Sequence, residues 1–109
     1  MIQVIIHRHN DKIKSFKISG HAESGPYGYD LVCAGVSAVS FGAVNAVLSL
    51  CDIDLEIDQA DDGGYLRVTI PNDTADAERT KAELILDAMV VSLKTIEHDY
   101  NKHILILDE

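Results

Sequence analysis

The chain has 109 residues, which is enough for a single domain, residues 1–109, built around one hydrophobic core. Hydrophobic residues make up 47% of the chain and charged residues 25%, a globular composition that excludes wholesale disorder. The formal net charge of −9 argues against nucleic acid or an anionic membrane as the main partner, because either would repel the chain.

The first part of the chain predicts a hairpin, a loop and a long helix. Two strand-like segments, IQVII (2–6) and IKSFKIS (13–19), are joined by the polar turn HNDK and predict the hairpin. Residues 21–29 carry no sustained period and predict a loop. Asp30 is expected to cap a helix that begins at Leu31 and contains no charged residue through Cys51.

A second hairpin is predicted next. IDLEID (53–58) alternates apolar and acidic residues, which is typical of a half-buried strand. The turn QADDGG follows, and YLRVTI (65–70) alternates again.

The chain closes with a helix and a short strand. The helix is expected at about residues 75–98, capped by Asp73 or Thr74. Its apolar residues approximate helical spacing: Leu84, Ile85, Ala88, Val91, Leu93 and Ile96. HILIL (103–107) predicts the last strand. The order ββαββαβ predicts an α+β fold, a two-layer domain in which two helices lie on one mixed sheet.

The uncharged helix is long enough to cross a membrane. We prefer a buried helix of a soluble protein, because the segment contains serines and an asparagine and has acidic flanks without nearby Lys or Arg. Small residues recur at every fourth position and form a ridge for close approach: Ala34, Ala38, Gly42 and Ala46. A helix that is apolar all round needs cover on more than one face, so we expect a homodimer with this helix at its interface.

The two cysteines, Cys33 and Cys51, are expected to be free thiols in a reducing cytoplasm, because the N-terminus has no secretory signal pattern. A buried apolar role is the simplest interpretation of Cys33. Its expected place in the first helical turn favours the thiolate, however, and makes Cys33 a candidate nucleophile. Cys51, at the opposite helix end, is interpreted as structural.

A cysteine nucleophile needs a base, and His21 stands at the end of a predicted strand, where a loop of nine residues leads to the helix start. Pairing of His21 with Cys33 is geometrically possible, but the spacing alone does not establish it. Ser37 either orients the histidine or the substrate, or bonds back to a helix carbonyl. Asp30 is interpreted first as a helix cap. Gly25 and Gly28 fit an ordinary turn better than a mobile gate.

No metal or cofactor is expected. His7 and His9 share a strand face, but two ligands without a partnered cluster are too few. The acidic run from Asp52 lacks the glycine and terminal glutamate of a calcium loop. Gly63 and Gly64 predict a turn. They do not predict a phosphate-binding loop, because such a loop is followed by a helix and this turn is not.

The segments GHA (20–22) and YDLVCAGVSAV (29–39) resemble the signature of the bacterial ribosomal-processing cysteine proteases. The similarity continues through FGAVNAVLSL (41–50), DDGGYLRV (61–68) and VVSLKTIEHDYNKHI (90–104), so it covers nearly the whole chain. The spacing from histidine to cysteine and the DLVCAGVS block are its specific parts.

The resemblance implies a homodimeric, cytoplasmic endopeptidase that removes the N-terminal extension of a large-subunit ribosomal protein beyond a pair of aromatic residues. It assigns the catalytic roles to His21 and Cys33 and supporting roles to Asp30 and Ser37. It also implies a mobile gating loop between histidine and cysteine, comprising Ala22, Glu23, Ser24, Gly25, Pro26, Tyr27, Gly28 and Tyr29.

Two other functional classes remain open on the sequence. In a non-catalytic ribosome-assembly or protein-binding module, Cys33 would simply be a core residue. A thiol-disulfide oxidoreductase is less favoured, because the chain contains no C-x-x-C motif.

Overall fold

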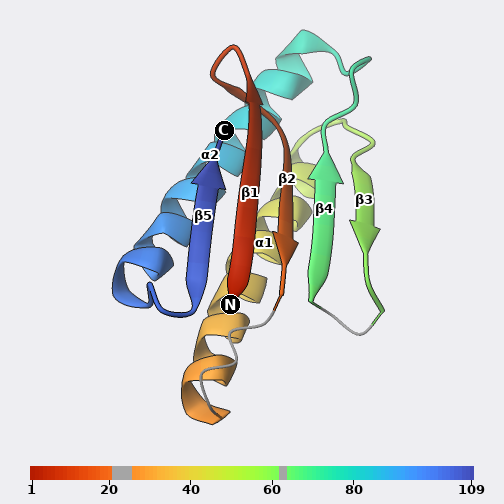
Figure 1. Cartoon of the computed structure of the whole chain (residues 1–109). Helices are drawn as coiled ribbons and strands as arrows, with labels where there is room; N and C mark the ends of the chain where they lie inside the picture. The colour runs from red at the N-terminus through yellow and green to blue at the C-terminus, as the bar shows by residue number, and fades with distance from the viewer. Residues whose placement is uncertain (21–25, 62–63) are drawn as a thin grey trace.

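The computed structural model describes residues 1–20, 26–61 and 64–109, and these form one sheet and two helices (Figure 1). The elements in chain order are β1 (Ile2–His9), β2 (Lys12–Ser19), α1 (Pro26–Leu50), β3 (Glu56–Gln59), β4 (Tyr65–Thr69), α2 (Asp76–Asp99) and β5 (Ile104–Asp108). This order confirms the predicted ββαββαβ arrangement.

The five strands form a mixed sheet in the order β3-β4-β2-β1-β5. Strand β5 pairs with β1 in parallel, whereas β1–β2, β2–β4 and β3–β4 are antiparallel. Both helices lie behind the sheet in Figure 1, so the fold has two layers, as predicted.

The core lies between the sheet and the helices. The alternation in β1 turns Ile2, Val4 and Ile6 inward, and β2 contributes Phe16 and Ile18. Helix α1 covers them with a stripe of buried valines: Val32, Val36, Val44 and Val47. Burial of each such side chain contributes about 1.5–3 kcal/mol, so the shared inward face fixes the register of the strands.

Helix α1 begins earlier than the sequence predicted. It begins at Pro26, so the expected start at Leu31 with Asp30 as cap is wrong, and so is the loop assignment for residues 26–29. Proline is well suited to the first helical turn, because its fixed φ fits the helix and its missing N–H would be unpaired there. The other members of the predicted gating loop, residues 22–25, lie outside the described residues, as does His21.

Strand β3 is shorter and more exposed than the pattern 53–58 predicted. All four of its residues are exposed, whereas Ile53 and Leu55 precede the strand and pack against the core. The prediction of a half-buried strand is therefore wrong. The reason is position, because β3 is an edge strand and its apolar Ile57 stays exposed.

Two details of α2 also differ from the prediction. Its N-cap is Ala75, without a side-chain cap, while the Thr74 hydroxyl donates a hydrogen bond to the Pro71 carbonyl at 2.7 Å. The predicted apolar face is only partly correct, since Leu84 and Val91 are exposed. The buried face consists of Ala82, Glu83, Leu86, Met89, Val90 and Leu93.

Helix α1 packs against the sheet and against α2, and only one of its faces is covered by them. Its segment Leu31–Leu50 is apolar and long enough to cross a membrane, yet 28% of the residues in its most apolar stretch are buried inside the protein. Four large apolar side chains of α1 are exposed, namely Leu31, Phe41, Leu48 and Leu50, the last residue of the helix.

An ion-pair network ties β1, β5 and α2 together at the edge of the sheet. The Arg8 guanidinium donates to both Asp108 carboxylate oxygens, at 2.7 and 3.2 Å, and to Asp87 on α2 at 2.9 Å. The Arg8 hydrogen bond lowers the pKa of Asp108, and partial burial opposes this shift only in part.

We predict that Asp108→Asn lowers the free energy of unfolding by about 1 kcal/mol at pH 7, because the variant keeps the shape but loses the charge. A carboxyl whose pKa is lowered in the folded state stabilises the fold above its unfolded pKa, and loses this effect as the pH falls through its folded pKa. The difference from the parent should therefore shrink below about pH 4.

Denaturant unfolding at several pH values measures this difference. Asp54→Asn, at an exposed site outside the network, is the control and should change stability little. A stability loss for Asp108→Asn that is equally large at pH 2 would contradict the assigned charge effect.

Candidate active site

Cys33 lines a cavity of about 550 Å³. The cavity lies between α1 and the ends of β2 and β4, and its wall includes two aromatic side chains, Phe41 and Tyr65. The remaining apolar lining comes from Ile2, Ile18, Val36 and Leu66, and polar groups come from Ser40, Gln59 and Asp61. Cys33 itself is half-buried, so its thiol can meet a ligand that fills the cavity.

Gly20 brings the chain to this cavity directly before His21. Its φ of +89° lies in the left-handed region, and its N–H donates to the Gly64 carbonyl at 2.9 Å. A side chain at this position would overlap the carbonyl oxygen of Met1. Gly20 and Cys33 line the same cavity.

The structure places the candidate supporting residues differently from the sequence prediction. Ser37 is exposed and is absent from the cavity lining, whereas Ser40 is buried and lines it. The Ser40 hydroxyl donates to the Val36 carbonyl at 2.7 Å. The sequence held a signal for Ser40. It lies seven residues after Cys33, close to two full turns at about 3.6 residues per turn, so both residues fall on the same face of the helix.

The position of Cys33 within α1 corrects one part of the predicted chemistry. Counted from Pro26, Cys33 is the eighth helical residue and Asp30 the fifth. Only the first four N–H groups of a helix lack an internal acceptor, and the dipole effect fades beyond the first turn. The predicted activation of Cys33 by the helix start is therefore wrong for this arrangement.

Cys51 lies at the other end of α1 and is buried, with its N–H bonded to the Val47 carbonyl at 2.9 Å. Both thiols are free, as predicted. Within residues 1–20, 26–61 and 64–109, no three His, Cys, Asp or Glu side chains gather as a metal-binding group. Cys33 contributes a thiol to the cavity lining.

The family model of the cysteine protease Prp matches residues 1–105. The chain belongs to this family. It is 47% identical over 107 residues to the ribosomal processing cysteine protease Prp of Bacillus subtilis, a match that covers 97% of this chain and 96% of the relative. The Staphylococcus aureus protein of the same name is 43% identical over 93 residues, 85% of this chain and 84% of the relative. The family identifies the chain as a cysteine protease.

Solved structures of the S. aureus protease share the fold over the full length of both chains. The complex with a covalently linked product peptide has a TM-score of 0.88 at 40% identity. The complex with a substrate peptide has a TM-score of 0.86 at 39% identity. These similarities confirm the family resemblance that the sequence motifs predicted.

We predict that Gly20→Ala reduces peptide cleavage by about 100-fold, because the new methyl group forces the chain away from Met1 and displaces residue 21. The strained φ should also cost about 1–3 kcal/mol of stability. Activity is measured at a temperature at which thermal unfolding shows the variant to be folded.

Gly35→Ala is the matched control. A methyl group there meets only the Ile96 side chain at 3.6 Å, an ordinary contact, and alanine is favoured in a helix. Full activity of folded Gly20→Ala would contradict the positioning role of Gly20.

Proposed function

We propose that this chain is the ribosomal-processing endopeptidase of its host, which removes the N-terminal extension of a large-subunit ribosomal protein in the cytoplasm. The observation that carries the proposal is the shared cavity, whose lining includes Cys33 and Gly20, the residue before His21. The names of the B. subtilis and S. aureus relatives support the substrate class.

In the proposed reaction, Cys33 and His21 act as a dyad. The Cys33 thiolate attacks the scissile carbonyl carbon, and the carbon–nitrogen bond breaks as protonated His21 gives its proton to the leaving amine. Water then hydrolyses the thioester, releases the carboxylate product and restores the thiol. The activation of Cys33 is assigned to His21, because the thiol lies beyond the first turn of α1.

The cavity is the proposed site for an apolar side chain of the substrate next to the scissile bond. Phe41 and Tyr65 offer aromatic surface, and edge-to-face or offset aromatic pairs add about 0.5–1.5 kcal/mol beyond simple burial. A volume of about 550 Å³ accommodates a large aromatic residue. The net charge of −9 favours the approach of a basic substrate, as ribosomal proteins generally are.

We predict that iodoacetamide alkylates Cys33 faster at neutral pH than it alkylates an ordinary exposed cysteine, because the proposed partner His21 activates the thiol. His21→Ala should shift this reactivity toward that of an ordinary thiol. Rates are followed by mass spectrometry of the intact and digested protein.

Cys51 is the internal control, since it is buried and should react only on unfolding. Protection of Cys33 until the protein unfolds would contradict the proposed nucleophile. It would favour the alternative of a non-catalytic protein-binding module.

The proposed enzyme is a homodimer that buries the outer face of α1. Leu31 and Leu48 are exposed on this face, at 58% and 47%, and neither lines the cavity that holds Cys33. Between them run Ala34, Ala38 and Gly42, also exposed, and a methyl group added at Gly42 would meet nothing within 4 Å. This open ridge suits close approach of the same helix from a second copy.

We expect light scattering at micromolar concentration to give twice the mass of one chain, and Ala38→Glu to give the mass of a single chain, because a carboxylate would be buried without a partner. Leu84→Glu is the control, at a residue that is exposed on α2. A parent protein of single-chain mass would contradict the dimer.

A further inference from the structure

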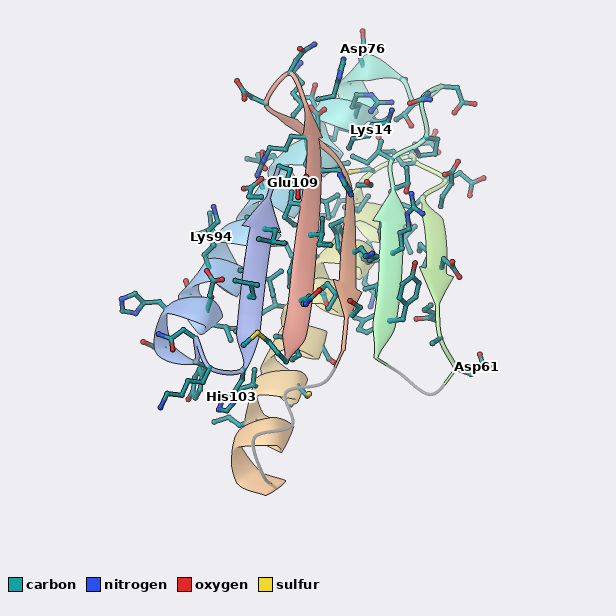
Figure 2. The ribbon with its side chains drawn as sticks, viewed as in Figure 1. Lys14, Asp61, Asp76, Lys94, His103 and Glu109 are labelled. Atoms are coloured by element: carbon teal, nitrogen blue, oxygen red, sulfur yellow. The ribbon has the colours of Figure 1, made fainter. Side chains whose placement is uncertain are left out.

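A second cavity, of about 330 Å³, lies at the end of the molecule opposite the start of α1. It is formed between the β1–β2 hairpin and the first turns of α2, and Figure 2 shows Lys14 and Asp76 at this end. Its lining is polar except for Ile13 and none of it belongs to the cavity that holds Cys33.

Positive charge gathers at this cavity. Lys12 and Lys14 of β2 and Arg79 of α2 line it, three of the nine Lys and Arg residues in a chain of net charge −9. His9 adds a further nitrogen donor. The Arg79 guanidinium is held in place, because one of its Nη groups donates to the Pro71 carbonyl. Cations from two elements therefore surround one small space, an arrangement that suits a compact anion.

A buried carboxylate faces the same cavity. Glu83 lies on the inward face of α2 beside the core residues Ala82 and Leu86, and only 9% of it is exposed. Within the described residues its carboxylate has neither an ion pair nor a hydrogen bond, although Arg79 is one turn away.

The carboxylate oxygens of Glu83 keep some access to solvent. In the described part of the chain, every fully buried side-chain polar atom has a hydrogen-bond partner. The Glu83 oxygens are therefore not fully enclosed, and the cavity that Glu83 lines is where they stay accessible. The cavity thus combines cations with a carboxylate that can accept hydrogen bonds from a ligand.

We propose that this cavity binds a small sugar phosphate. The phosphate would lie among Lys12, Lys14 and Arg79, and a sugar hydroxyl would donate to Glu83, with the amides of Asn10 and Asn72 bonding further hydroxyls. No Phe, Tyr or Trp is among the described lining residues, so a nucleobase has no stacking surface. The net charge of −9 disfavours a long polyanion such as RNA.

The test is a titration of the full chain with ribose 5-phosphate, with ribose and inorganic phosphate as half-ligands, followed by NMR shifts of backbone amides. We expect saturable binding that is at least about tenfold tighter than that of either half-ligand, since both subsites then contribute. Glu83→Gln should weaken ribose 5-phosphate relative to phosphate by about tenfold, because the charged acceptor of the sugar hydroxyl is lost, whereas phosphate, which a carboxylate repels, should bind no less tightly.

Lys14→Ala, at an exposed residue whose loss should not affect folding, is expected to weaken both ribose 5-phosphate and phosphate. Lys102→Ala, at an exposed lysine outside the cavity lining, is the matched control and should change neither.

Three results would overturn the proposal. The first is absence of saturation with ribose 5-phosphate in the millimolar range. The second is phosphate binding as tightly as the sugar phosphate with no effect of Glu83→Gln, which would indicate an adventitious anion only. The third is binding of a short oligoribonucleotide through Lys12 and Lys14 without binding of ribose 5-phosphate, which would assign the surface to RNA.

Discussion

The site depends on how α1 packs across the sheet. A stripe of valines on its inner face is buried against β1 and β2, and this contact fixes the rotation of the helix. The same rotation sets Cys33, Val36 and Ser40 along the cavity and turns Leu31 and Leu48 outward. The orientation of α1 on the sheet therefore places the Cys33 thiol at the cavity. It also exposes the apolar face that is proposed to contact a second copy of the chain.

The strands of the sheet were predictable because the central ones have one solvent-facing side and one buried side. Ile2, Val4 and Ile6 are buried in β1 and their neighbours Gln3 and His7 are polar, so this strand and, with the polar turn after it, the hairpin followed from the sequence. The set of residues that line the cavity with Cys33 was only partly predictable. The motif drew attention to His21 and Cys33, but the close contact of Gly20 with Met1 is a tertiary contact between chain segments that no local pattern encodes.

The errors arose where local patterns competed with tertiary structure. Asp30 was a plausible cap, yet Pro26 starts the helix four residues earlier and moves Cys33 out of the first turn. In α2, the apolar Leu84 and Val91 are exposed while the charged Glu83 is buried, so hydrophobicity alone gave the buried face only in part. In both cases, interpretation by residue type failed near a residue with a proposed function, Cys33 in α1 and Glu83 in α2.

The most direct measurement is cleavage of a synthetic peptide that carries the N-terminal extension of the host's large-subunit ribosomal protein, read by mass spectrometry beside Cys33→Ala. We expect one pair of fragments for the parent protein and none for the variant, with the cut after an aromatic residue. Equal cleavage by both proteins would contradict Cys33 as the nucleophile. Absence of cleavage by either, for a peptide shown to bind, would contradict the assigned activity.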